Sequence, residues 1–376
     1  MDLSLNEEQE LLKSSVADFM QHEVPKPVLL DLDRTEEGAP RELWNRIAQL
    51  GWVGMLIPQE FGGSGSSLTD AAVVFEELGK GPMPGPFFSS GVLGALTVME
   101  AASDQQKREI LPAVAQGTQI LTVAAQEPER RWGPGMVQMT ATPQNGTLTL
   151  NGTKLFIHDV MAATHIICAV RTSSSQNPTQ GISLVVVDKN TPGVSVRNLP
   201  GFLAWVGEVK FQNVRVPQSA ILGQAGSGWA AFERAVEKAI PVLCAYQVGG
   251  CDAIFNMSVE YSRTRIQFAQ PIGRFQRVQD HIVHLTNHMD AARWTTAEAL
   301  WKLDSNRPAA SSVHLAKAVS SEGYYQACNF AHEVHAGIGI SREYGLTLHT
   351  KMSRTLYQTL GDPLYHKRRM ADALGI

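Results

Sequence analysis

Three histidines and three glycine clusters have the residue types for metal or phosphate chemistry in this 376-residue chain. His281, His284 and His288 recur at three- and four-residue spacing, so a helix would place them on one face, as in a metal site. They lack a nearby cysteine and a paired acid at ligand spacing. We therefore interpret them as surface or interface histidines and expect no metal.

The glycine clusters lie at 62–65, 223–228 and 336–339. A dinucleotide-binding glycine loop follows a strand and opens a helix within a strand–helix–strand unit. None of the three clusters has that sequence context, so we interpret them as turns and helix ends.

The elements that would position a site follow a helical, β, helical order. Apolar residues at three- and four-residue spacing, as in Leu12 and Val16, predict helices through residues 1–117. Residues 118–223 change to short β-type runs separated by turn residues, and residues 224–376 return to long helical segments, enough for a four-helix bundle. We therefore expect an α+β protein with an N-terminal helical domain, a middle β domain and a C-terminal bundle.

Local signals place some of these elements more closely. Asn6 and Gln9 have the spacing of a capping box at the start of the first helix. Thr69 or Asp70 is expected to cap a second helix after a Gly/Ser-rich turn. The Asn145-Gly146 step, flanked by alternating residues, predicts a β-hairpin.

Composition excludes several classes of partner. Lys plus Arg number 32 and Asp plus Glu 36, a net charge of −4, so neither nucleic acid nor an anionic membrane is an expected partner. The acidic N-terminus has no signal-peptide pattern, and no apolar run is long enough to cross a membrane. The cysteines are scattered and without metal-type spacing, which favours a reducing, cytoplasmic setting: Cys168, Cys244, Cys251 and Cys328.

Six segments carry a resemblance to a known family. They are GWVGMLIPQEFGGSGSSLTDAAVVFEELGK, AAQEP, LNGTKLFIHDV, VRVPQSAILGQAGSGW, RTRIQFAQPIGRFQRVQ and HEVHAGIGI. They occur in the order found in acyl-CoA dehydrogenases, and together they span nearly the whole chain. The chain is therefore identified as a member of that family by resemblance.

The resemblance implies a function and partners. It implies α,β-desaturation of an acyl-CoA substrate with hydride transfer to FAD, which lies between the β domain and the C-terminal bundle. It also implies assembly as a dimer or tetramer and an electron-transferring flavoprotein as acceptor. The C-terminal pattern resembles subunits of heteromeric family members that act on steroid or ring-bearing side chains.

The resemblance assigns cofactor-binding residues of two kinds. Arg265, Phe268 and Gln276 match the residues that a subunit lends to its neighbour's FAD: a planar set of donors for phosphate, an apolar face and an amide. The segments that would face the chain's own flavin depart from the family pattern. Gln126 replaces a threonine before Glu-Pro and is followed by residues 129–131 and Trp132, and Phe156-Ile157-His158 replaces aromatic-Ile-Thr. Glu333 stands where glutamine is common, and Ala336-Gly337 replaces a glycine pair.

The family's catalytic glutamate is missing. Aligning Tyr357-Gln358 with the usual segment places Gly361 at that position, with Asp362 beside it. A second family position, on the first long helix of the bundle, is Ala239. Glu237 is near in sequence, but two residues rotate it by about 200° around a helix, away from the face that Ala239 presents. A carboxylate base for the α-proton is therefore absent from both places.

Three hypotheses follow. The first is a base-lacking subunit of a heteromeric acyl-CoA dehydrogenase, because the residues lent to a neighbour are kept and those facing the chain's own flavin are changed. The second is a homomeric enzyme with Asp362 as catalytic base, although Asp362 also fits a helix N-cap. The third is a flavin-free scaffold of the same fold.

Overall fold

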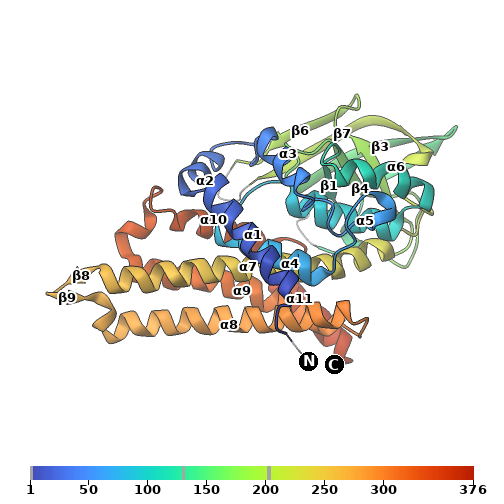
Figure 1. Cartoon of the computed structure of the whole chain (residues 1–376). Helices are drawn as coiled ribbons and strands as arrows, with labels where there is room; N and C mark the ends of the chain where they lie inside the picture. Colours follow the sequence, from blue (N-terminus) through green and yellow to red (C-terminus); the bar gives the residue numbers. More distant parts are fainter. Residues whose placement is uncertain (1–2, 129–131, 201–204) are drawn as a thin grey trace.

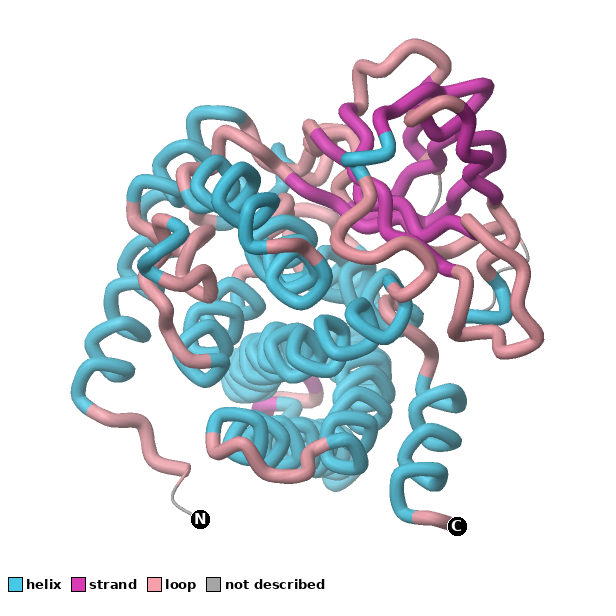
Figure 2. Tube along the Cα trace, turned by 90° about the vertical axis from the view of Figure 1, so that its right-hand side faces the viewer, coloured by secondary structure: helices cyan, strands magenta, loops and turns pink. Residues whose placement is uncertain are grey.

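The computed structural model describes residues 3–128, 132–200 and 205–376. Its elements follow the expected helical, β, helical order, and the predicted α+β class is confirmed. Figure 2 shows most of the strands gathered in one body beside a larger helical body, with a short piece of strand among the helices.

The N-terminal part consists of six α-helices and two short helices of other types within residues 3–118. They are α1 (Glu7–Glu23), α2 (Lys26–Leu32), α3 (Arg41–Gln49), the 3-10 helix η1 (Gln59–Phe61), α4 (Leu68–Lys80), the π-helix η2 (Phe87–Gly94), α5 (Ala95–Ala101) and α6 (Asp104–Ala115).

Capping confirms one predicted helix start and corrects another. The Asn6 side chain accepts from the Gln9 backbone, and the Gln9 side chain accepts from the Asn6 backbone, as predicted. In α4 the cap is Ser67 rather than Thr69 or Asp70, because Asp70 sits at the third helical position and completes a capping box with Ser67.

The middle part is a seven-stranded mixed sheet in the order β1-β4-β2-β3-β7-β6, with β5 paired to β4. The strands are β1 (Leu121–Ala124), β2 (Thr140–Gln144), β3 (Thr147–His158), β4 (His165–Arg171), β5 (Ile182–Asp188), β6 (Val194–Asn198) and β7 (Val206–Pro217). The short 3-10 helices η3 (Pro134–Met136) and η4 (Gln218–Ala220) accompany them. Asn145 and Gly146, both at positive φ (49° and 76°), join β2 to β3 and confirm the predicted hairpin.

The C-terminal part is a bundle of α7 (Gly228–Thr264), α8 (Gln276–Asp304), α9 (Ala310–His335) and α10 (Leu346–Gln358), with α11 (Pro363–Leu374) packed on α9. Between α7 and α8 the strands β8 (Ile266–Gln267) and β9 (Gln270–Pro271) form a small hairpin at one end of the bundle, at the left in Figure 1. The 3-10 helices η5 (Ile272–Arg274) and η6 (Ala336–Ile340) precede α8 and follow α9.

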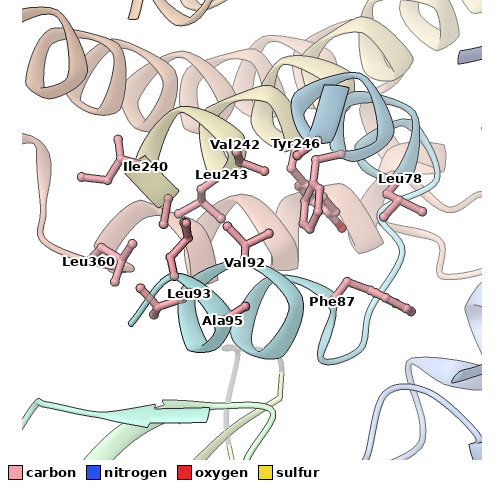
Figure 3. Packing of buried hydrophobic residues seen from close by; sticks show 14 of the residues in the cluster. Leu78, Phe87, Val92, Leu93, Ala95, Ile240, Val242, Leu243, Tyr246 and Leu360 are labelled. Carbon is pink, nitrogen blue, oxygen red and sulfur yellow. The ribbon is translucent and has the colours of Figure 1, made fainter. Parts of the chain in front are cut away.

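Two large hydrophobic cores, and a third small cluster of Ala72, Ala245 and Leu300, lie among the described residues. The larger joins the N-terminal helices, α7 and the bundle, as in the contacts of Leu78, Val92 and Leu243; Figure 3 shows α7 packed between these elements. The smaller fills the sheet body, with Leu150 and Val209 fully buried. The sheet body is thus a separate unit set against the helices, and a cavity between the two must be lined by both.

Candidate functional site

A cavity lies where the sheet body meets the helices. It is called the first cavity, and β1, the end of β3, η2, the start of α7 and the segment after α10 supply its walls. Its lining residues include Phe88, Thr122, Gln126, Trp132, Phe156, His158, Phe232, Gln358, Thr359 and Leu360.

Three of the residues predicted to face the flavin line this cavity. Gln126, Phe156 and His158 contribute to its wall, and all three are half-buried. Ile157, also predicted, packs in the core of the sheet body instead, because successive residues of a strand point to opposite faces. A register shift between Lys154 and Ile157, with Phe156 at positive φ (53°), bends β3 where it reaches the cavity.

A buried ion pair anchors the segment that carries Gln126. Lys154, fully buried, donates to the Glu127 carboxylate at 2.7 Å, and this carboxylate also accepts from the backbone of Gln138 and Met139. Burial lowers the pKa of Lys154. Glu127 therefore fixes the backbone next to Gln126. Residues 129–131 lie outside the described part of the chain.

His158 is held by hydrogen bonds from both sides of the cavity. Thr122 donates to the His158 carbonyl at 2.6 Å. Thr359 donates its hydroxyl proton to the Thr355 carbonyl at 2.9 Å, so its oxygen accepts from His158 Nε2 at 3.0 Å. Burial lowers the pKa of His158 to about 4, and the nearby charge of Lys317 lowers it too. The ring is therefore neutral near pH 7, with its proton on Nε2 and a lone pair on Nδ1.

Residues 358–361, at the end of α10 and just after it, are the segment that the resemblance aligns with the family's base. Gln358, Thr359 and Leu360 line the first cavity. The buried Lys317 ammonium donates to the Leu356 carbonyl at 3.0 Å, and His366 Nε2 donates to the Leu360 carbonyl at 3.1 Å. These bonds hold Leu360 at positive φ (62°), an uncommon conformation for a branched side chain.

Asp362 caps α11. Its carboxylate accepts from the Tyr365 backbone at 2.7 Å, and the residue is exposed and is not among those that line the first cavity. The neighbouring Gly361, which the resemblance aligns with the family's base, brings no side chain. The geometry thus gives Asp362 a clear structural role.

The second position that the resemblance suggests for a base, Ala239, is also without an acid. Ala239 is fully buried in the larger core. Glu237 lines a neighbouring cavity with Glu233 and Arg369, which form an ion pair at 3.3 Å. Burial raises the pKa of Glu237.

The residues predicted to serve a neighbour's FAD lie at the other end of α7. Arg265, Phe268 and Gln276 are exposed, with 88% of Phe268 open to solvent. Arg265 ends α7, Phe268 lies between the strands of the β8–β9 hairpin and Gln276 begins α8 (Figure 1).

Glu333 and Gly337 belong to the same end of the bundle. Both are exposed, and they flank His335, whose ring stacks on Tyr261 near the end of α7 at 4.8 Å. By contrast, Phe232 near the start of α7 lines the first cavity. Thirty-three residues separate Phe232 from Arg265, about 50 Å along a helix at about 1.5 Å per residue. The residues at this end of the bundle are therefore remote from the first cavity of their own chain: Arg265, Phe268, Gln276, Glu333 and Gly337.

The three histidines of α8 surround an aromatic ring. His284 and His288 stack on Phe330, at 5.1 and 5.9 Å between ring centroids, and His281 lies at 5.9 Å. Within the described ranges, no group of three or more His, Cys, Asp or Glu side chains has the arrangement of a metal site.

Sequence reasoning missed several cavity residues. Thr122 and Thr359 stand in none of the quoted motifs, and their partners are remote in sequence: His158 and Thr359 are 201 residues apart. Asp159 stands inside the LNGTKLFIHDV segment but was given no role. Glu127 carried a signal, since it stands inside the AAQEP segment, but its partner Lys154 could not be found from spacing.

Comparison with known proteins identifies the family. Models of the acyl-CoA dehydrogenase N-terminal, middle and C-terminal domains match residues 6–118, 122–214 and 226–375. A probable acyl-CoA dehydrogenase of Bacillus subtilis is 30% identical over 352 residues, 92% of each chain. The acryloyl-CoA reductase (NADH) of Anaerotignum propionicum is 30% identical, over 92% of this chain and 89% of its own.

Solved structures agree. The FAD complex of PigA has a TM-score of 0.91 at 26% identity, over 100% of this chain and 99% of its own. Butyryl-CoA dehydrogenase from Megasphaera elsdenii has a TM-score of 0.91 at 24% identity over 100% of both chains, a likeness in fold. The class defined is that of FAD-dependent oxidoreductases, as expected. The chain belongs to the acyl-CoA dehydrogenase family.

Proposed function

We propose that this chain is the base-lacking subunit of a heteromeric acyl-CoA dehydrogenase that desaturates a bulky, steroid- or ring-bearing acyl-CoA. One observation carries the proposal: among the described residues that line the first cavity, none is Asp or Glu. The segment at the family's base position presents Gln358, Thr359 and Leu360 there, and a carboxylate is needed to take the α-proton.

The names of relatives support a thioester as the substrate. Their names include acryloyl-CoA reductase and, in Serratia, an L-prolyl-[peptidyl-carrier protein] dehydrogenase, 29% identical over 82% of both chains. Each name specifies an acyl group carried by CoA or by a carrier protein.

The residues of the first cavity fit the ring system of FAD. Phe156 offers an aromatic face, and His158 Nδ1 a lone pair. The Gln126 amide, which makes no side-chain hydrogen bond to another described residue, offers two donors and an acceptor. Bound there, FAD would supply a hydride acceptor, the chemistry that the family's reaction uses at the β-carbon.

This chain's own residues then orient the reactants and exclude water. Thr359 and Thr122 hold His158 in one tautomer and one position, and the Glu127–Lys154 pair holds the backbone beside Gln126. Leu360 and Phe232 contribute apolar surface to the cavity wall. Such a cavity binds and orients an acyl thioester but holds no carboxylate of its own. Because the proton and the hydride leave the same bound acyl group, desaturation takes place in the site of the partner chain, which supplies its own carboxylate.

The two ends of α7 support a shared cofactor. Arg265, Phe268 and Gln276 are about 50 Å along the helix from the first cavity and so serve the FAD of an adjoining subunit. Phe268 is 88% exposed in the single chain, which suits a residue that a second chain covers. We propose a dimer or tetramer that includes a related chain.

The other two hypotheses are less well supported. A homomeric enzyme with Asp362 as base requires this carboxylate to leave the α11 cap and enter the first cavity. A flavin-free scaffold is disfavoured because Gln126, Phe156 and His158 all line one cavity. A purified protein without a flavin absorption band would restore the scaffold hypothesis.

The electron acceptor and the compartment are also proposals. Family resemblance favours an electron-transferring flavoprotein as acceptor. In the described ranges no helix is long and apolar enough to cross a membrane. The four cysteines are buried free thiols, which fits a reducing cytoplasm.

Native mass spectrometry of the protein from its own host, combined with turnover assays, tests the proposal. We expect a complex with a related chain, bound FAD, and an isolated chain that is inactive or very slow. Rapid desaturation by the isolated chain would overturn the base-lacking role.

A further inference from the structure

A second cavity adjoins the first and contains a carboxyl group that the proposed function does not use. His158, Thr355 and Thr359 line both cavities. The second is otherwise mostly apolar, with walls from Leu78, Phe87, Leu243, Tyr246, Met352 and Leu356. Figure 3 shows Leu78, Phe87, Leu243 and Tyr246 together around this part of the core. Of the described residues that line it, Asp159 is the one with a carboxyl group.

The Asp159 carboxyl is only partly satisfied. Its Oδ2 accepts from the Ser89 hydroxyl at 2.7 Å, and among the described residues no other side chain or backbone group donates to it. The neighbouring Tyr246 hydroxyl is already used, since it donates to the Met83 carbonyl at 3.0 Å. An ionised carboxylate accepts about four hydrogen bonds, so most of its capacity is open to the cavity.

Burial raises the pKa of Asp159 to about 6, while the Ser89 hydroxyl opposes that rise. At pH 7 the group is still mostly ionised. Among the described residues, no Lys, Arg or His forms an ion pair with the Asp159 carboxylate. A half-buried anion without a cation costs free energy, which a ligand group that donates to it would recover.

Backbone geometry does not explain the charge. Asp159 has positive φ (54°), its N–H donates to the Trp205 carbonyl, and its carbonyl accepts from Ala162 and Ala163. Asparagine adopts this left-handed conformation as readily as aspartate. The turn therefore explains why a short polar residue stands at position 159. It does not explain why that residue is a charged aspartate rather than an asparagine.

We propose that Asp159 is a specificity-determining residue that binds a hydrogen-bond-donating substituent, a hydroxyl or a protonated amine, on an otherwise bulky and apolar acyl group. The proposal rests on the proposed function in assuming that these cavities take an acyl thioester. Asp159 lines the second cavity and directly follows His158, which lines both cavities, so the substituent would lie in the second cavity beside the first.

The test uses the flavin-loaded complex and three kinds of probe: cyclohexanecarbonyl-CoA and its ring-hydroxylated and ring-aminated derivatives, with the substituent at each ring position. Dissociation constants are measured by calorimetry. We expect at least one hydroxylated or aminated derivative to bind about tenfold tighter than the parent or better, as a charge-assisted hydrogen bond provides. Asp159→Asn should abolish the preference for the amine over the parent.

Two controls accompany this variant. Asp104→Asn, on the exposed first turn of α6, removes an equal charge and should leave all preferences intact. Ser89→Ala frees Oδ2 and should retain the preference for the amine. The role of Asp159 would be overturned if the unaltered complex bound all derivatives equally, or if Asp159→Asn kept the same preference. Neither result would contradict the proposed function. Failure to bind any of the thioesters would overturn the proposed function with it.

Discussion

The two ends of α7 are built in opposite ways. At the start of the helix the functional side chains are buried or half-buried and tied to one another, as in the bond between His158 and Thr359. At its end, Arg265 and Phe268 are exposed. The difference teaches that the side chains of the first site are held in place by partners within the chain, whereas those of the second are left free to contact another molecule. Changes at the first should therefore alter stability, and changes at the second should alter cofactor binding.

The largest effect is expected at the buried pair beside the first cavity. Glu127→Gln leaves the fully buried Lys154 ammonium without its counter-ion, which should lower the free energy of unfolding by about 3–5 kcal/mol. Urea denaturation followed by circular dichroism measures this. In the exposed pair of Glu322 with Lys367, Glu322→Gln should cost less than about 1 kcal/mol. Equal losses in the two variants would contradict the comparison.

A fall in pH should lower the free energy of unfolding through His158, which lines the first cavity. His158 has a pKa of about 4 in the fold against an ordinary value of 6.5, so between these values the unfolded chain binds more protons. Its contribution to stability is therefore present above pH 6.5 and lost as the pH falls towards 4. At about 1.4 kcal/mol per pH unit it amounts to about 3 kcal/mol at most.

The matched variant is His158→Gln, which keeps a donor for Thr359 but does not titrate. Unfolding free energies measured from pH 7 to pH 4 should fall less steeply in this variant than in the unaltered chain. Parallel pH profiles would show that His158 is not buried in its neutral form.

At the far end of α7, Arg265→Ala should weaken FAD retention at least tenfold. A charge-assisted bond to phosphate contributes about 1.5–3 kcal/mol. The stability of the single chain should not change, because Arg265 is exposed. Arg263→Ala, also exposed and two residues away, is the control and should retain FAD. Fluorescence titration of the deflavinated complex measures both. Wild-type retention by Arg265→Ala in an intact assembly would show that Arg265 is misassigned.

The smallest effect is expected for Asp362→Asn. Asparagine caps a helix about as well as aspartate, so both stability and the turnover of the complex with its partner chain should change little, by less than about twofold. Asp362→Ala, which removes the cap, should cost about 0.5–2 kcal/mol of stability. Steady-state assays and thermal unfolding separate these outcomes. If Asp362→Asn abolished turnover while FAD stayed bound, Asp362 would be the base and the base-lacking role would fail.

Local signals predicted local structure. The Asn6–Gln9 capping box and the Asn145-Gly146 hairpin depend on residues a few positions apart, and both were predictable. The start of α4 was misplaced because two nearby residues also suit a cap, and the choice of Ser67 depends on Asp70 as its partner.

The candidate site was predictable where it follows family motifs and not where it depends on packing. Gln126, Phe156 and His158 were expected at the flavin, and they line one cavity. The hydrogen bond from Lys317 to the Leu356 carbonyl joins segments that are far apart in the sequence. The same is true of the hydrogen bond from Ser89 to the Asp159 carboxylate. Such contacts between distant segments cannot be predicted from residue types and their spacing.

The length of α7 has a consequence for how the chain can vary. Each residue of an α-helix advances it by about 1.5 Å and turns it by about 100°. Deleting one residue between Phe232 and Arg265 would leave both side chains present but rotate one relative to the other by that angle. An assembly in which each chain reaches into its neighbour could not close around such a change. We therefore expect α7 to accept substitutions but neither insertions nor deletions, because its length fixes the distance and the relative rotation of the two sites.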